Sequence, residues 1–305
     1  MLKAYRFDSL DARLILIQER GFVSEQTASM AEKIVQATGD LPTMPHVASM
    51  VLQKLGNPNT SPKELHQTIS ADQALAARVL KVANSPLYGC SRAINRLTDA
   101  VVIMGFDSLR SLVMSSVMQD LFKSFGLTEK LLWEHSFGCA AISKHIAKVI
   151  KYPKVEEAFL AGLLHDIGKV VLNLKIPDKT REIVQEVYNN PGISFMQAEQ
   201  EMFGFNHAQV GKLIARKWNF AETIEETIGC HHDPRQARIL PVLTVIVNFG
   251  NLVCHKLEVG PTRNPDLDLF EFESTRLLRF NEESLGKLMA EVGELMAEKD
   301  SMLAL

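Results

Sequence analysis

Apolar residues recur at helical spacing along almost the whole chain, and no stretch shows the strict alternation typical of strands. One example is a stripe of apolar positions from Val47 to Leu55 that ends at Gly56. The pattern therefore predicts an all-α protein. The expected helices cover 8–38 (as two short helices), 47–55, 98–104, 107–125, 128–151, 155–174 and 177–190. Further helices are expected to begin near residues 62, 73, 195 and 207. Gly204 should end the helix that begins near 195, and Asn206 should cap the one that begins at 207.

Capping residues, prolines and glycines mark the helix boundaries. Residues 61–64 (Ser-Pro-Lys-Glu) combine an N-cap serine, a proline at the first helical position and a glutamate three residues after the serine. Residues 70–73 (Ser-Ala-Asp-Gln) predict a second capping box. The helix that follows should stop before Pro86, because the residue before a proline is pushed out of the helical region. Gly105 and Gly126 are expected as C-terminal stops.

Two later segments allow alternatives. Residues 239–257 are apolar enough for a buried strand, but the run is long and its neighbours are helical, so a buried helix is predicted. In the tail, 260–305, leucines and a valine recur at heptad spacing from Leu285 to Leu295. Two heptads are too few for a coiled coil, so packing on the core is favoured over dimerisation. The predicted organisation has four parts: an N-terminal helical extension, a small helical subdomain, a larger helical bundle, and a linker with a final helix. They cover 1–34, 35–126, 127–258 and 259–305.

Composition and charge narrow the class of protein. The 305 residues are 46% apolar and 23% charged, as in an ordinary globular protein of about two domains. The net charge of −3 gives no global basic field, which disfavours nucleic acid and membranes as partners. The four cysteines are widely spaced without a CxxC motif, which is typical of free thiols in a reducing compartment. With no signal core and no apolar run near the ~20 residues of a membrane span, a cytoplasmic location is expected.

The candidate chemistry centres on His165 and Asp166, which are adjacent at the end of an apolar run. Other histidines at intervals on both sides could project into the same cavity between helices, where bundles build metal sites. Imidazole and carboxylate together favour a divalent transition metal such as iron, manganese, nickel or zinc, as one ion or two. The predicted ligands are His135, His165, Asp166, His207, His231 and His232, whereas His46, His66, His145 and His255 are interpreted as ordinary core or surface residues.

Lys169 and Asp166 are the candidate catalytic residues, should the site be active. A metal ion held by Asp166 and several imidazoles could acidify a bound water for attack on a phosphorus centre. Lys169 lies one helical turn beyond His165 and could meet the charge of the phosphate. The alternative is that Gly168-Lys169 is an ordinary solvated helix end.

The order of these residues resembles that of the HD superfamily of metal-dependent phosphohydrolases. Residues 165–169 (His-Asp-Ile-Gly-Lys) are similar to the HD-GYP branch, which hydrolyses cyclic di-GMP at an iron or manganese cluster. By this resemblance the six residues named above would be metal ligands, and Lys169 would contact the scissile phosphate.

The chain also departs from that pattern. Where the superfamily places a final aspartate ligand, this sequence has Asn248 and Asn251, whose amides bring no negative charge. The Gly-Tyr-Pro signature is missing after His232, and Leu131 stands where some HD-GYP sites have a glutamate. These departures remove the parts that supply charge and bind substrate, so they argue against hydrolysis.

Three segments of the N-terminal half resemble the HDOD family, the HD-related output domain of bacterial signalling. They are residues 41–45 (Leu-Pro-Thr-Met-Pro), 70–85 and 99–106, and the similarity extends over about 35–255. The resemblance implies a regulatory protein whose HD cavity binds metal, and a nucleotide ligand, to set its conformation for a protein partner. The alternative is a metal-dependent phosphohydrolase acting on a nucleotide or cyclic di-nucleotide. Asn248 and Asn251 favour the regulatory protein, whereas Lys169 favours the hydrolase.

Overall fold

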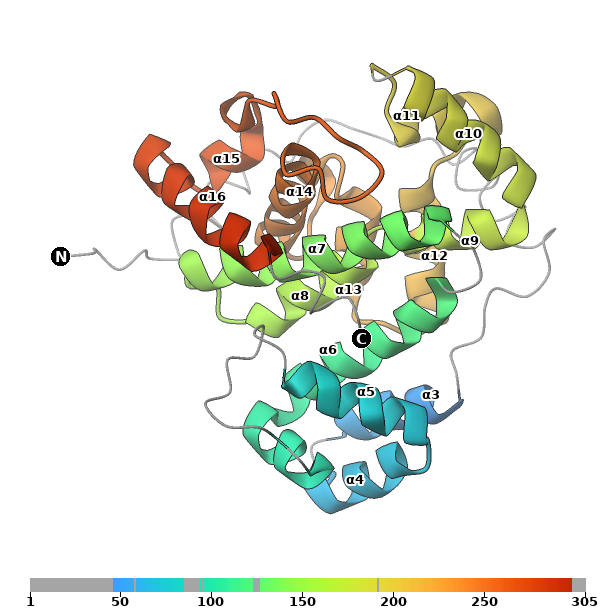
Figure 1. Cartoon of the computed structure of the whole chain (residues 1–305), viewed down its shortest axis with the longest axis vertical. Helices are drawn as coiled ribbons and strands as arrows, with labels where there is room; N and C mark the ends of the chain where they lie inside the picture. The colour runs from blue at the N-terminus through green and yellow to red at the C-terminus, as the bar shows by residue number, and fades with distance from the viewer. Residues whose placement is uncertain are drawn as a thin grey trace.

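The fold is all-α, as the periodicity predicts (Figure 1). The computed structural model describes residues 46–57, 59–84, 94, 96–122, 127–190 and 192–297, and these contain no strand. The α-helices are α3 (His46–Leu55), α4 (Pro62–Ser70), α5 (Gln73–Ala83), α6 (Leu97–Phe122), α7 (Leu127–Val149), α8 (Val155–Leu164), α9 (Ile167–Lys175), α10 (Pro177–Asn189), α11 (Phe195–Phe203), α12 (His207–Lys217), α13 (Glu222–Cys230), α14 (Pro241–Lys256), α15 (Glu273–Leu277) and α16 (Glu282–Ala297). Two 3₁₀ turns, η3 (Pro234–Gln236) and η4 (Leu269–Glu271), complete the set. The helices predicted over 8–38 and the break at 41–45 lie outside the described residues.

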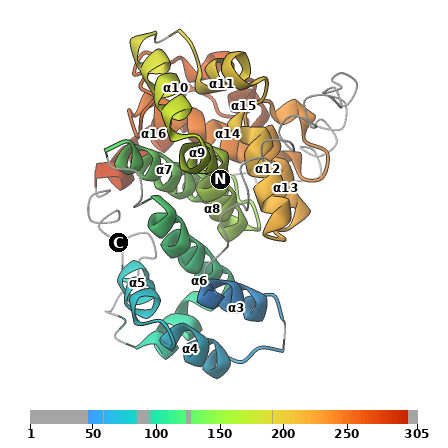
Figure 2. The same cartoon turned by 90° about the vertical axis from the view of Figure 1, so that its right-hand side faces the viewer.

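Helices α3, α4, α5 and part of α6 enclose a small hydrophobic core at one end of the molecule (Figures 1 and 2). The capping box at the start of α4 is confirmed: Ser61 Oγ accepts from the Glu64 backbone, and Glu64 Oε2 accepts from the Ser61 backbone. The second predicted box is wrong, because α4 continues through Ser70. The cap of α5 is instead Asp72, whose Oδ1 accepts from the backbone N–H of Leu75 at 3.0 Å.

Helix α6 joins this small core to a larger one. The predicted break at Gly105 is confirmed, since Gly105 adopts φ 75° and ψ 172° inside an otherwise helical run. Beyond it, Leu109 and Leu112 pack in the small core, whereas Met118 packs in the large one. Gly126 lies outside the described residues.

The expectation that no segment matches a membrane span is wrong on length and composition. The helical residues Leu97–Gln119 are long and apolar enough to cross a membrane, but 61% of their most apolar stretch is buried inside the fold. A core helix of a folded protein has the same properties, and this segment makes up most of α6, which joins the two cores.

The larger core is built on α7, α8 and α14, which pack against one another. Glycines permit this close approach, since a Cβ on Gly162 of α8 would lie 2.8 Å from the carbonyl oxygen of Cys139 in α7. The buried helix predicted over 239–257 is confirmed as α14. The prediction that the tail packs on the core is also confirmed, because Leu285, Leu288 and Val292 of α16 are buried in it.

The segment predicted as one helix over 155–174 is two helices. Helix α8 ends at Leu164 and α9 begins at Ile167, so His165 and Asp166 form the junction. The next two boundaries are confirmed: α11 ends at Gly204 with φ 75°, and Asn206 caps α12. The chain therefore turns at the positions that carry the candidate chemistry.

Candidate metal centre

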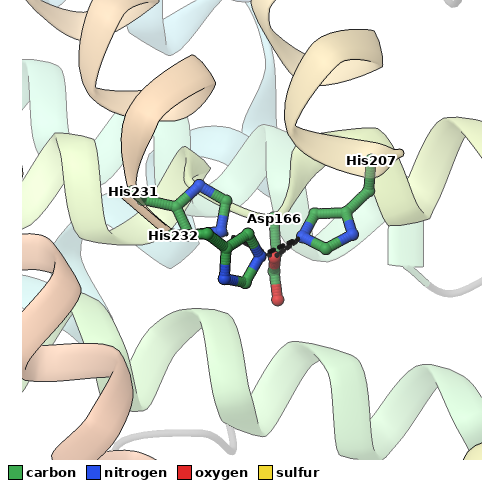
Figure 3. Close-up of side chains that lie close together, drawn as sticks. All are labelled: Asp166, His207, His231 and His232. Carbon is green, nitrogen blue, oxygen red and sulfur yellow. Dashed lines mark hydrogen bonds and ion pairs between the residues drawn. The ribbon is translucent and has the colours of Figure 1, made fainter. Parts of the chain in front are cut away.

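The predicted ligands meet where several helix ends converge. Asp166 follows α8, His207 begins α12, and His231 and His232 follow α13 (Figure 3). His135 comes from the middle of α7 and His165 from the α8–α9 junction. Five of the six side chains are buried, and His232 is partly buried. The structure thus brings all six residues into one cluster.

The Asp166 carboxylate lies between two groups of histidines. Its Oδ2 is 3.4 Å from Nε2 of both His135 and His165. Its Oδ1 is 3.2 Å from Nε2 of His207 and 3.6 Å from Nε2 of His231. Asp166 thus belongs to two groups, one with His135 and His165 and one with the other three histidines. Within each group, the possible ligand atoms lie within 4.8 Å of one another. Asp166 could therefore act as a metal ligand together with either group of histidines.

Hydrogen bonds on the far side of the rings fix their orientation. Three rings donate Nδ1–H to backbone carbonyl oxygens, His135 to Val259 (3.1 Å), His165 to Gly162 (2.7 Å) and His231 to Ile228 (2.8 Å). Each Nε2 is therefore left facing Asp166, as in metal sites whose outer hydrogen bonds set the tautomer of the ligands. Nε2 of His232 lies 2.8 Å from Nε2 of His207.

Glu199 of α11 holds one of the predicted ligands, and the sequence did not reveal it. Its Oε2 accepts from both the backbone N–H (2.7 Å) and Nδ1 (2.6 Å) of His207. The carboxylate is buried, and it supplies the negative charge that a ligating histidine commonly has behind it. No spacing signal marks Glu199, because it precedes His207 by eight residues and a helix boundary.

His255 also lies against the cluster, although the sequence placed it among the ordinary histidines. Its ring stacks on that of His135, with centroids 5.6 Å apart and an interplanar angle of 19°. His145 fits its background interpretation, since it pairs with Glu291 at 2.8 Å. His255 therefore forms part of the wall around one histidine group.

Lys169 is buried, which excludes the interpretation of a solvated helix end. Its Nζ is 2.7 Å from Asp166 Oδ2 and 4.8 Å from the ring centroid of Phe195. Beside it, Leu172, Phe195 and Glu199 line a cavity of only ≈ 10 Å³. The cavity beside Lys169 is therefore too small to hold a phosphate.

Burial and charge divide the histidines into two protonation states. Burial lowers the pKa of His135 to about 4 and holds the pKa values of His231 and His232 well below 6.5. For His165, burial is outweighed by the Asp166 carboxylate and by Cys139, which raise the pKa to about 9. For His207, burial is likewise outweighed by the Glu199 carboxylate, and the pKa rises. In the metal-free protein, neutral imidazoles thus stand beside the imidazolium of His165.

The residues fit a divalent transition metal. His231 Nε2 and Asn251 Oδ1 are buried and have no hydrogen-bond partner within the described part of the chain, and Asp166 Oδ1 has none there besides its contact with His207. Such buried orphans are rare in native proteins unless an ion or water serves them. The 3.2–3.6 Å spacings around Asp166 suit atoms that each lie roughly 2.0–2.2 Å from a common ion.

The two asparagines behave differently. Asn248 donates Nδ2–H to the backbone carbonyl of His231 at 2.7 Å, so it secures the backbone of a predicted ligand. Asn251 is 5% exposed and leaves its Oδ1 without a partner among the described residues. Because Asn248 and His255 both reach the cluster from α14, the residue between them on that helix face, Asn251, faces it as well.

An all-α fold with this histidine–aspartate cluster defines the class of protein, and comparison with known proteins gives the family. The HDOD domain model matches residues 41–234, so the chain belongs to the HDOD family, as the three N-terminal segments predicted. The likeness to the HD-GYP branch rests on residues 165–169 alone and stays a prediction.

Solved structures agree with this assignment. An HDOD domain protein of unknown function from Geobacter sulfurreducens is 31% identical in sequence, and its structure matches with a TM-score of 0.76. The match covers 92% of this chain and 97% of the Geobacter chain. A candidate phosphohydrolase from Shewanella amazonensis SB2B shares the fold at 24% identity, with a TM-score of 0.70 and coverages of 88% and 96%. An uncharacterised protein of Treponema pallidum (strain Nichols) is 25% identical over 270 residues, which are 86% of this chain and 52% of that protein. The chain thus spans about half the length of this relative.

Proposed function

We propose that this HDOD protein is a bacterial regulatory module whose buried cluster binds a divalent transition metal. In this proposal, metal loading, with or without a nucleotide ligand, sets the conformation that a protein partner recognises. The observation that carries it is the position of the Asp166 carboxylate, with one oxygen toward each group of histidines. The helices that present these ligands would then be tied together when the ion is bound.

Three features favour regulation over hydrolysis. Because Asn248 and Asn251 are amides, Asp166 is the one carboxylate in the two ligand groups found among the described residues. Little negative charge is therefore available to offset the charge of a divalent ion. Lys169 is already paired with Asp166 and covered by Phe195. The predicted ligands are buried, so the phosphate of a substrate has no open approach to most of them.

The second candidate function is a metal-dependent phosphohydrolase acting on a nucleotide or cyclic di-nucleotide. It is favoured by the position of Lys169, whose ammonium lies 2.7 Å from the carboxylate of the cluster. A divalent ion there would supply Lewis acidity toward a phosphorus centre. Lys169 would orient the phosphate, and Asp166 would hold the ion.

Hydrogen exchange and a turnover assay distinguish the two functions. The protein is stripped of metal and reloaded with manganese or iron, and exchange is followed in α8, α12 and α13. Regulation predicts slower exchange in these helices on loading, and no turnover of cyclic di-nucleotides, nucleoside triphosphates or generic phosphodiesters. Turnover that disappears in Asp166→Ala would replace this proposal with the hydrolase. Exchange that is unchanged by metal would contradict it directly.

A further inference from the structure

A cleft of ≈ 1080 Å³ separates the small N-terminal core from the larger bundle. One wall comes from α3 and α6, and the other from the start of α8 and the connection between α12 and α13. In Figure 2, α3 lies below α12 and α13. This volume is at the upper end of the range for pockets that bind small molecules.

The cleft and the metal cluster lie at opposite ends of the same three helices. Helix α8 begins at the cleft and ends just before His165, and α13 begins at the cleft and ends just before His231. Helix α12 runs the other way, from His207 to the cleft. Helices of 9–11 residues are roughly 14–17 Å long. A ligand in the cleft would therefore act on the helices that present the predicted metal ligands.

Arg110 of α6 gives the cleft a place for an oxyanion. One guanidinium nitrogen, Nη2, donates to the carbonyl oxygen of Leu55 at 3.1 Å, which holds the side chain against α3. Arg110 pairs with no carboxylate in the part of the chain that the structure describes. The remaining N–H donors form the fork that binds carboxylate or phosphate groups.

Across from Arg110, two aromatic rings line the cleft. Trp218 ends α12 and Phe220 precedes α13, with ring centroids 6.1 Å apart in an edge-on arrangement. Asn219 between them has φ 54°, a left-handed conformation that asparagine tolerates and that turns the chain sharply. Both rings are partly exposed, so a planar ligand could stack there.

The acidic residues of the cleft are mostly neutralised within the protein. Glu156 pairs with Lys144 at 2.7 Å, and Glu157 pairs with Lys154 at 3.2 Å. Asp107, three residues before Arg110 on α6, is exposed. Among the described residues, the charged groups of the cleft that form no ion pair are therefore the Arg110 guanidinium and the Asp107 carboxylate.

We propose that this cleft binds a small molecule consisting of a planar ring and an oxyanion. The oxyanion, a phosphate or a carboxylate, pairs with Arg110, and the ring packs on Trp218. The site does not require metal in the cluster, so its test is separate from that of the proposed function.

The test uses isothermal titration calorimetry on the metal-free chain with four probes. Adenosine 5′-monophosphate and phenylacetate carry a ring and an oxyanion, whereas adenosine lacks the anion and inorganic phosphate lacks the ring. At least one of the first two should bind, about tenfold or more tighter than either of the last two. Binding of adenosine 5′-monophosphate would indicate that the oxyanion is a phosphate, and binding of phenylacetate would indicate a carboxylate. The same probe should quench tryptophan fluorescence in the unaltered chain. It should also do so in Trp133→Phe, where Trp218 is the one remaining tryptophan.

Variants then assign the contacts. Arg110→Gln should weaken binding about tenfold or more, whereas the matched change Lys154→Gln should have a smaller effect, since Lys154 is paired with Glu157. Asp107→Asn should tighten binding about twofold, because it removes a repelling charge. The proposal is overturned if neither probe with ring and oxyanion binds, if adenosine binds as tightly as its monophosphate, or if binding survives Arg110→Gln unchanged.

Discussion

Glu199 holds His207 at two points, since one carboxylate oxygen accepts from the backbone N–H at 2.7 Å and from Nδ1 at 2.6 Å. This places Nε2 of His207 toward Asp166. We predict that Glu199→Gln weakens metal binding by about 10–100-fold, because the ring loses the charge that fixes its tautomer. Competition with a fluorescent chelator measures the change. Glu201→Gln, an exposed residue of the same helix, is the matched control and should leave the affinity unchanged.

Metal binding should release protons at neutral pH. His165, with a pKa of about 9, is protonated in the metal-free protein at neutral pH, and the raised pKa of His207 increases the protonated fraction of that ring. Both rings must become neutral to ligate. We expect about one to two protons per molecule at pH 7, and an affinity that rises from pH 6 to pH 8. Titration calorimetry in buffers of different ionisation enthalpy counts the protons. A count of zero would mean that neither imidazolium takes part in binding.

Gly168 allows α9 to approach α12 closely. A Cβ at this position would overlap the carbonyl oxygen of His207 and lie 2.8 Å from the backbone nitrogen of Gly211. We predict that Gly168→Ala lowers the free energy of unfolding by more than about 3 kcal/mol and weakens metal binding, because His207 is displaced. The control is Gly192→Ala, where a Cβ has open space. Urea unfolding checks both, and equal midpoints would refute the packing argument.

Asn251 and Asn248 should respond in opposite ways to the same change. Asn251→Asp brings a carboxylate to a buried oxygen that lacks a partner among the described residues, so metal affinity should rise about tenfold while the metal-free protein loses stability. Asn248→Asp sets a carboxylate oxygen against the carbonyl of His231, so affinity and stability should both fall. Thermal unfolding with and without metal separates these effects. Identical behaviour of the two variants would show that Asn251 does not face the ion.

Local sequence signals account for most of the helix boundaries. Ser61, Asn206 and Gly204 each mark an end through backbone chemistry that acts over three or four residues. The error at Ser70 has the same origin, since Ser70 and Asp72 both can cap and the length of α4 decided between them. The junction at His165 carried no such signal, and the continuous apolar pattern concealed it.

The cluster was predicted from the order of residue types, whereas its surroundings were not. Glu199 and His255 reach the histidines through helix packing, which leaves no trace in spacing along the chain. The same holds for Arg110 and Trp218, which are more than a hundred residues apart and line one cleft. That the six predicted ligands hold a metal ion stays a prediction that requires a measurement.

The most direct test is the metal content of the chain purified without a polyhistidine tag. We predict about one to two equivalents of iron, manganese, nickel or zinc by mass spectrometry, and less than about a tenth of an equivalent in Asp166→Asn, with unchanged helix content by circular dichroism. Less than about a tenth of an equivalent in the unaltered chain, including after exposure to each metal, would contradict the account. Equal metal in the chain and in folded Asp166→Asn would contradict the central role of Asp166.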